Sequence, residues 1–501
     1  MGVWPPFSGL EADADRCHLD GVPLQSWAGA LGRLGDIDGG FALAWVDTRG
    51  LHLARDAVGH RSLYWGRRAD GAVVFGSRLR EVARRLDRRP RLHRPAVATY
   101  LAYAYVPRPG TLVEGVYAVG PGEELVFSSG QAEPTRRETW TLPVEPPVFE
   151  AEERLRAELR RELERAVAEA LPEGPVGAFL SGGIDSSLVV ALAARRGPVR
   201  ALSVSFGPGH ANELEWSSLV SRHCGVEHHV VEVSPDRVRR HFDATVGALS
   251  MPNGDPLTVP NWMLFDAAAE VTGVVINGEG GDPCFGGPKN APMLLAQLYG
   301  EGSAEEAYLA AHQRCWEDLG EMLEEGLPTE HLVEDLRPWF ADPRWPGLLN
   351  RLMAINITFK GAWHILPKVE HLGAARGVTA RSPLFARRVV ELSVRVPGQL
   401  KRAGAREKHL LKDAVADLLP SNVVERPKSG MMVPVEAWFS GPLAGWARER
   451  LLDGPGLRGL VRRRWLERLL DNRLGSLRPR RGIKIWQLLT LESWVRSLEV
   501  T

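Results

Sequence analysis

Apolar positions follow two different patterns along the chain, and the change falls near residue 150. In the first part, short apolar runs are separated by polar turns, at 41–46, 51–55, 62–65 and 72–75. Runs of this length between glycine-containing turns are typical of antiparallel strands. The pattern therefore predicts a β-rich domain over residues 1–140.

A proline-rich stretch at 142–147 predicts a linker, after which strands and helices alternate. A charged amphipathic helix is expected over 152–171, and buried strands over 176–180, 200–206, 229–233 and 274–277. Strands that alternate with helices form parallel sheets, which bind ligands at the carboxyl ends of their strands. From about residue 300 the pattern is mostly helical. Residues 150–501 are therefore predicted to form an α/β domain with a doubly wound parallel sheet and a helical C-terminal part.

The composition narrows the classes of protein that fit. The 501 residues carry 62 basic and 62 acidic side chains, so the zero net charge gives no support for a nucleic-acid partner. The four cysteines are widely spaced without a C-x-x-C pair, which fits a reducing compartment better than a disulfide framework. No apolar run approaches the ~18 residues of a membrane helix, and the first residues lack the pattern of a secretory signal. We therefore expect a cytoplasmic protein without a membrane partner.

The segment Ser181-Gly182-Gly183-Ile184-Asp185-Ser186-Ser187 lies between the predicted strand 176–180 and a helix expected over 188–194. Backbone N–H groups at the start of a helix attract anions, and glycines allow a phosphate to approach the backbone closely. The segment matches neither the loop that ends in Gly-Lys-Ser/Thr nor the dinucleotide loop Gly-x-Gly-x-x-Gly. It is similar to the pyrophosphate loop of enzymes that split ATP between its α and β phosphates.

A second glycine-rich segment, 277–287, follows the predicted strand 274–277. Further short motifs occur later in the chain, at 408–412, 419–420, 426–430, 433–434 and 438. In their order and spacing these segments resemble the asparagine synthetase superfamily, over nearly the whole chain. In the first part, residues 34–41, 54–56 with Gly59, 106–111 and 121–122 resemble the class II glutaminase domain of that family.

The resemblance implies an enzyme that uses ATP and Mg²⁺ to adenylate a carboxylate, with AMP and pyrophosphate as products. It implies that Asp185 and Asp282 hold Mg²⁺, which favours oxygen ligands. Lys428 would stabilise the oxyanion and the leaving phosphate when an amine attacks, and Glu279 would orient or deprotonate that amine. The implied nucleotide-binding residues are Ser181, Gly182, Gly183, Asp185, Ser186, Leu202, Ser203, Gly278 and Lys408.

The chain departs from the family at the glutaminase nucleophile. That nucleophile is a cysteine exposed as the new N-terminus after removal of Met, whereas position 2 is Gly2 and the first cysteine is Cys17. The strands that would precede Leu31 are expected to be mostly missing. The first domain is therefore predicted to be a truncated sandwich of the Ntn-hydrolase type that does not hydrolyse glutamine.

Other departures concern the acid substrate. β-Lactam and carbapenam synthetases and lasso-peptide cyclases also lack the cysteine, but the catalytic tyrosine of the β-lactam branch is replaced here by Glu279. Thr379 stands where asparagine synthetases have a glutamate, and Pro283-Cys284 replaces an acidic-apolar pair. These changes predict a substrate other than aspartate. The candidate pocket residues are Asn253, Asp255, Lys289, Asn290, Lys360 and Trp363.

The sequence therefore predicts an AMP-forming carbon–nitrogen ligase that joins a small-molecule or peptide carboxylate to a substrate amino group, in the same molecule or in another. Three alternatives stay open: an ammonia-dependent asparagine synthetase, a tRNA-modifying enzyme with the same loop, and a relic without activity. A homodimer is also left open.

Overall fold

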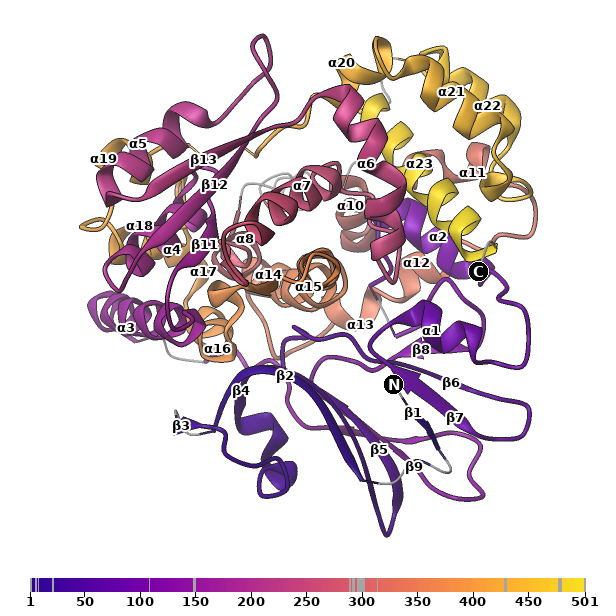
Figure 1. Ribbon diagram of the computed structural model, residues 1–501, viewed down its shortest axis with the longest axis horizontal. Coiled ribbons are helices and arrows are strands. Elements are labelled where there is room, and N and C mark those ends of the chain that lie inside the picture. Colours follow the sequence, from indigo (N-terminus) through magenta and orange to yellow (C-terminus); the bar gives the residue numbers. More distant parts are fainter. Residues whose placement is uncertain are drawn as a thin grey trace.

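The computed structural model describes residues 2–4, 7, 9–19, 22–107, 109–146, 150–287, 290, 293–294, 302–312, 314–427, 430–475 and 480–499. In Figure 1 the N-terminal strands (indigo and violet) lie below an α/β part that is surrounded by helices. None of the helices described combines the length and the apolar character that crossing a membrane requires.

Two antiparallel sheets form the N-terminal part. Side chains from both sheets share one core, in which Trp65 of the first sheet meets Phe127 of the second edge-to-face. This arrangement is the sandwich that the alternating apolar runs predict. The first sheet has the order β1 (Gly2–Trp4), β7 (Val73–Gly76), β6 (Tyr64–Arg67), β8 (Val116–Ala118). The second has the order β10 (Thr135–Glu138), β9 (Glu123–Phe127), β5 (Gly50–Arg55), β4 (Ile37–Asp47), β2 (Leu10–Leu19), β3 (Val22–Pro23).

The strands before Leu31 differ from the expectation, because β1, β2 and β3 all lie in a region predicted to lack most of its strands. The ten residues of β2 are largely exposed and include Glu11, Asp13 and Asp15. Residues 10–15 do alternate apolar and polar, but their alanine, aspartate and glutamate side chains are uncommon in strands, so the signal was weak. Pairing with β4 holds this segment as a strand, although its own sequence does not clearly indicate one.

The α/β part is built on a five-stranded sheet in which every neighbouring pair is parallel. The predicted α/β fold class, with its doubly wound parallel sheet, is thereby confirmed. The strand order is β13 (Glu227–Glu232), β12 (Val199–Ser205), β11 (Val176–Phe179), β14 (Val274–Ile276), β15 (Thr379–Arg381). The chain leaves β11 toward β12 on one side, and β14 lies on the other. The sheet therefore has its switch point between β11 and β14, where open α/β sheets bind ligands.

Helices cover this sheet and form most of the C-terminal part. In the longest helix before the sheet, Leu155, Leu159 and Leu163 recur every fourth residue and are all buried, so one face packs on the core. The principal helices are α1 (Leu79–Arg84), α2 (Arg94–Tyr103), α3 (Glu152–Ala170), α4 (Ile184–Ala194), α5 (Leu214–Cys224), α6 (Pro235–Ala248), α7 (Thr258–Ala269), α8 (Gly281–Phe285), α10 (Ala304–Ala311), α14 (Leu348–Ile355), the π-helix η4 (Asn356–Ile365), α15 (Leu366–Ala375), α16 (Arg387–Arg395), α18 (His409–Ala414), α20 (Val435–Ser440), α21 (Ala444–Asp453), α22 (Arg463–Leu470) and α23 (Arg481–Glu499).

The N-terminal part and the α/β part share a continuous apolar core. Helix α2 contributes Tyr100 and Leu101 to the cluster that also contains Trp486 and Leu489 of α23. The Tyr100 hydroxyl donates to the carbonyl of Gln487 at 2.9 Å, and the Gln487 amide donates back to the Tyr100 carbonyl at 2.7 Å. Neither part can bury this surface alone, so each stabilises the other.

The buried side chain of Arg55 joins the two parts at the end of β5. Its guanidinium donates to the carbonyls of Gly59 (2.9 Å), Arg61 (2.5 Å) and Val119 (3.2 Å) in the N-terminal part and of Ala362 (3.1 Å) in η4. It also lies over the ring of Trp363, 5.0 Å from the centroid. A planar fork with five donors can satisfy several carbonyls at once, which a lysine cannot.

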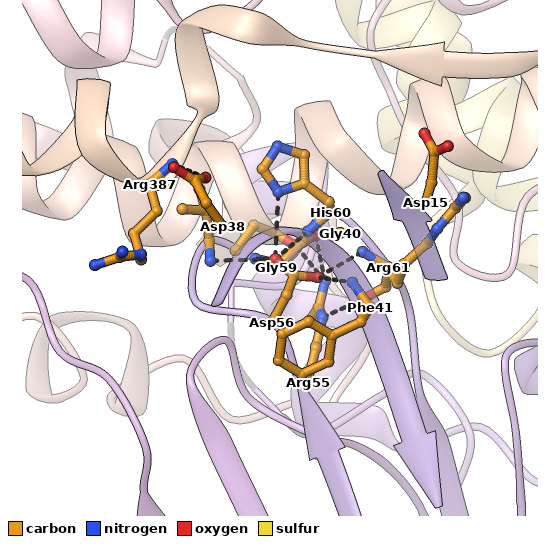
Figure 2. Close-up of polar contacts among 12 residues, drawn as sticks. Asp15, Asp38, Gly40, Phe41, Arg55, Asp56, Gly59, His60, Arg61 and Arg387 are labelled. Carbon is orange, nitrogen blue, oxygen red and sulfur yellow. Dashed lines mark hydrogen bonds and ion pairs between the residues drawn. The ribbon is translucent and has the colours of Figure 1, made fainter. Parts of the chain in front are cut away.

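Two aspartates of the second sheet also cross the interface. Asp15 of β2 receives two hydrogen bonds of 2.7 Å from the Arg381 guanidinium at the end of β15. Asp38 of β4 accepts the backbone N–H of Arg387 at 3.1 Å, a contact visible in Figure 2. The N-terminal sheet is therefore fixed directly to the strand beside β14.

Replacing Arg55 tests how far the joint stabilises the fold. Arg55→Met leaves buried carbonyls of both parts without their donor, and each hydrogen bond to a charged group contributes about 1.5–3 kcal/mol. We expect the free energy of unfolding, measured in urea, to fall by about 3 kcal/mol or more. Arg49→Met, which removes an exposed guanidinium, is the control and should change it by less than about 0.5 kcal/mol. Equal effects of the two substitutions would contradict the role of Arg55.

Candidate active site

The predicted pyrophosphate loop lies at the switch point, between β11 and α4. Helix α4 begins at Ile184 rather than at 188, so Asp185 and Ser186 lie in its first turn. The Ser186 hydroxyl accepts the backbone N–H of Ser181 at 3.1 Å and donates to the Gly183 carbonyl at 3.2 Å. Gly182 has φ +79°, and a Cβ there would lie 2.5 Å from the backbone nitrogen of Ser217. The loop is thus held by its serines and closes so tightly that only glycine fits at 182.

The second glycine-rich loop follows β14 and packs against the first. A Cβ on Gly278 would lie 2.4 Å from the backbone nitrogen of Ser186, and one on Gly281 would lie 2.2 Å from the Asp185 carboxylate. Pairing of β11 with β14 brings the two loops together, since the carboxyl ends of parallel strands share one edge of the sheet. The residues that the sequence selected in the two loops therefore form one site.

Lys408 connects the two predicted metal ligands. Its ammonium lies 2.6 Å from Asp185 Oδ2 and also forms an ion pair with Asp282 Oδ1. Lys408 is 1% exposed and adopts the left-handed conformation with φ +54°, which few residues other than glycine adopt. Lys408 therefore compensates the charge of the buried Asp185 and of the partly exposed Asp282.

A small cavity opens beside the loop and has a basic lining. Arg426 forms an ion pair of 2.7 Å with Glu213 and lies over the Trp216 ring, 4.7 Å from its centroid. Arg426 and Lys412 lie in the motifs 426–430 and 408–412, but neither was predicted as a site residue. The cavity is lined by Gly183, Ile184, Glu407, Lys408, Lys412, Val423, Arg426 and Pro427.

Leu202 and Ser203, predicted to line the adenine pocket, lie on β12 beside the loop. Leu202 is 1% exposed and belongs to the apolar core. The Ser203 hydroxyl donates to the Leu180 carbonyl at 2.5 Å and pairs with His228 Nε2 at 2.8 Å. Leu202 packs in the apolar core and Ser203 is hydrogen-bonded within the protein. Their contact with adenine stays a prediction.

Glu279 lies on the opposite side of the second loop, next to a buried ion pair. The Lys368 ammonium is 2.9 Å from Asp255 Oδ2 and 4.0 Å from Glu279 Oε1. Burial alone would raise the pKa of Asp255, but the charge of Lys368 holds it well below its usual range. Burial lowers the pKa of the neighbouring His364 strongly, which keeps this imidazole neutral.

The candidate pocket residues fall into three groups. Asn253 and Trp363 line a cavity between the N-terminal part and the α/β part, which Arg55, His364 and Lys368 also line. Asn290 accepts from Asn356 of η4 at 3.1 Å and donates to the Gly287 carbonyl at 3.0 Å, so it has a structural role. Asp255 and Lys360 lie near Glu279. Lys289 and Lys428 lie outside the described residues.

The segment that resembles a glutaminase is organised around the buried carboxylate of Asp56 (Figure 2). Five backbone N–H groups donate to it at 2.7–3.3 Å, from Phe41, Val58, Gly59, His60 and Arg61. Although burial opposes the shift, hydrogen bonds from His60 and the backbone hold the pKa of Asp56 below its usual range. Asp56 therefore shapes the turn after β5.

Nearby, Cys17 lies within β2. Its thiol donates weakly to the carbonyls of Gly40 at 3.6 Å and Asp15 at 3.8 Å. Burial, together with the negative charges of Asp56 and Asp15, raises the pKa of Cys17 to about 12.

A phosphate-sized loop at the switch point of a parallel sheet, faced by paired carboxylates, defines an α/β enzyme that acts on a nucleotide. The family model described as "Asparagine synthase" matches residues 158–496, and the chain belongs to this family. A second model, described as a glutamine amidotransferase domain, matches residues 27–140. Members of the asparagine synthase family are ligases that form carbon–nitrogen bonds with ATP, which confirms the family and the class of enzyme predicted from the motifs.

Three curated relatives illustrate the range of the family. Asparagine synthetase [glutamine-hydrolyzing] 1 of Bacillus subtilis is 23% identical over 478 residues, which is 89% of this chain and 75% of the relative. A putative asparagine synthetase of Mycobacterium tuberculosis is 27% identical over 495 residues, covering 91% and 75%. Carboxyethyl-arginine beta-lactam-synthase of Streptomyces clavuligerus is 25% identical over 320 residues, covering 63% and 52%.

The close packing of the two glycine-rich loops fixes the shape of the phosphate loop, and Gly278 and Gly281 make this packing possible. Gly278→Ala tests this packing, because the added Cβ would meet the first turn of α4. We expect binding of Mg-ATP, measured by calorimetry, to weaken by at least tenfold. In the control Gly273→Ala, on the segment that leads into β14, the added Cβ meets nothing within 4 Å and binding should be unchanged. Normal binding by the Gly278 variant would show that the nucleotide lies elsewhere.

Proposed function

We propose that this ligase adenylates a substrate carboxylate and transfers the acyl group to an amino group of a substrate, without hydrolysing glutamine. The observation that carries the proposal is the state of Cys17. It lies inside a strand, and its pKa is raised to about 12. Because the thiolate is the reactive form of cysteine, a thiol with this pKa is a poor nucleophile at neutral pH.

The first strand, Gly2–Trp4, contains no cysteine. Gly2 pairs with Phe75 in the first sheet, and a Cβ at position 2 would lie 2.3 Å from the Phe75 ring. A side chain here would therefore displace a buried aromatic residue. Under this proposal, an amine of the substrate or free ammonia supplies the nitrogen.

In the first step, a carboxylate oxygen of the substrate attacks the α-phosphorus of ATP and pyrophosphate leaves. Ser181, Gly182, Gly183 and Ser186 would bind the departing pyrophosphate through N–H and O–H donors, with Lys408 adding a positive charge. Asp185 and Asp282 would hold Mg²⁺, an ion that favours oxygen ligands and neutralises charge on the phosphates. The acyl-adenylate formed has AMP as its leaving group.

In the second step the amine attacks the acyl carbon, the new C–N bond forms and AMP leaves. Glu279 would accept or orient a proton of the amine, since its carboxylate borders the site near the loop after β14. The Lys368 ammonium lies 4.0 Å from Glu279 Oε1. Lys428 would stabilise the oxyanion and the leaving phosphate. This role is assigned from its sequence motif alone.

Product analysis tests the proposal. Carboxyethyl-arginine carries a carboxylate and an amine in one molecule. This compound appears in the name of the beta-lactam-synthase relative. We expect purified protein with Mg-ATP to release AMP and pyrophosphate in the presence of this acid or a related amino acid, with no added ammonia. Glutamine should yield no glutamate, and Cys17→Ala should leave the rate unchanged.

Aspartate with ammonia serves as the second substrate pair. Formation of asparagine and AMP from this pair alone would instead support an ammonia-dependent asparagine synthetase, and release of ADP would contradict both. Glutamate release that disappears in Cys17→Ala would restore the glutaminase.

Asp185 and Asp282, which both pair with Lys408, give a separate test of metal binding. Removing one member of a buried ion pair costs about 3–5 kcal/mol, so Lys408→Met should lower the melting temperature strongly. If Asp185 and Asp282 hold Mg²⁺, the ion replaces the lost charge and should raise the melting temperature of this variant more than that of the wild type. Lys484→Met breaks the equally buried Lys484–Asp318 pair (2.6 Å) and is the matched control. An equal response of the control to Mg²⁺ would exclude a metal at the aspartates.

A further inference from the structure

Lysine is rare in this chain, and the rare lysines are buried. Only eight of the 62 basic residues are lysines, and the rest are arginines. Five of the lysines in the described part of the chain are between 1% and 4% exposed: Lys368, Lys401, Lys408, Lys412 and Lys484. In the described part of the chain the exposed basic side chains are arginines, whereas most of the lysines are buried. The sixth described lysine, Lys360, therefore needs a functional explanation.

Lys360 lies on η4, next to the loop that follows β14. This segment has the wide π-helical turn, which is uncommon in proteins and occurs frequently at functional sites. Helix α8 of the loop packs on η4, and Asn356 of η4 bonds to Asn290 just beyond the loop. The π-helix therefore holds Lys360 beside the predicted catalytic residues.

The ammonium of Lys360 has no ion-pair partner. Among the residues that the structure describes, no carboxylate lies within 4.0 Å of it and no hydrogen bond is formed. By contrast, Lys368 is paired with Asp255, and Lys408 with Asp185 and Asp282. Lys360 is only partly exposed, so its charge is incompletely solvated.

Three carboxylates beyond ion-pair distance act on the charge of Lys360. Burial lowers the pKa of Lys360, and the charges of Asp282, Glu279 and Asp255 act against this shift, in that order. A substrate carboxylate that approached Lys360 would be repelled by all three acids. Its binding therefore needs a cation away from the phosphate loop. Lys408, Lys412 and Arg426 line a separate cavity, which lies beside that loop.

We propose that Lys360 binds the reacting carboxylate of the acid substrate, an inference that rests on the proposed function. Glu279 and Asp255 would attract the amino group of the same substrate, so the pocket distinguishes the two ends of a molecule that carries both charges. The substrate class is accordingly an amino acid or a peptide with a free amine near the reacting carboxylate.

Chemical labelling tests the binding without any turnover. Acetic anhydride modifies lysines and spares arginines, so peptide mass spectrometry resolves each of the few lysines. Carboxyethyl-arginine, aspartate and related amino acids are the probes, and both arms contain α,β-methylene-ATP, which the enzyme cannot cleave between these phosphates. We expect Lys360 to react faster than the paired Lys368 and Lys484, and at least one acid to protect Lys360 selectively. Protection by none of the acids would overturn the inference.

Steady-state kinetics give the second readout. Because a hydrogen bond to a charged group is lost, Lys360→Met should raise the KM for the acid roughly 10- to 100-fold and leave the KM for ATP within about twofold. Lys360→Arg keeps the charge and should recover part of the affinity. Arg239→Met, on the exposed face of α6, is the surface control. An unchanged KM for the acid, or an equal rise in both KM values, would contradict carboxylate binding.

The two hypotheses can fail separately. If the wild type releases no pyrophosphate with any acid, the proposed function fails, while the labelling still decides whether Lys360 binds carboxylates. If pyrophosphate is released and no acid protects Lys360, the function stands and the assignment of Lys360 fails. If Lys360→Met does not fold, the labelling of the wild type and Lys360→Arg remain decisive.

Discussion

The parallel pairing of β11 with β14 is the constraint on which the site depends. It joins Gly177 to Val275 and Ala178 to Ile276, so both strands end at the same edge of the sheet. The loops that follow can then pack so closely that a Cβ on Gly281 would overlap the Asp185 carboxylate. Two acids from segments almost a hundred residues apart thereby come within reach of one ammonium, that of Lys408.

Charge compensation decides much of what surrounds these acids. Each carboxylate moved out of water must be paired, and the desolvation cost is recovered only with good geometry. Lysine suits this task because its ammonium is compact and its stem is apolar, whereas a guanidinium needs partners for five donors. Arg55 illustrates the opposite case, since four carbonyls converge on it at the joint between the two parts. The two residue types therefore occupy different kinds of buried site in this chain.

The parts of the site that the sequence predicted are local in the chain. The loop at 181–187 and the loop at 277–287 each follow a short apolar strand, and this signal is contained within a few residues. The Asp255–Lys368 pair spans 113 residues, and nothing in either local sequence indicates the partner. Strand β2 was missed for a different reason, because its alternating residues are alanines and acids, which are uncommon in strands. The early start of α4 also escaped the pattern, since glycine and serine at its beginning are weak helix formers.

The N-terminal part stabilises the rest of the fold, whatever chemistry it carries. Its helix α2 lies in the same core as α23, and its β2 and β4 bond directly to the strand and helix that follow the site, through Asp15 with Arg381 and Asp38 with Arg387. Arg381 ends β15, the neighbour of β14, so the support of the N-terminal sheet reaches the edge on which the catalytic loops lie. Removal of this part would expose a large apolar surface and release that edge of the sheet. Its persistence therefore follows from packing and does not require a glutaminase.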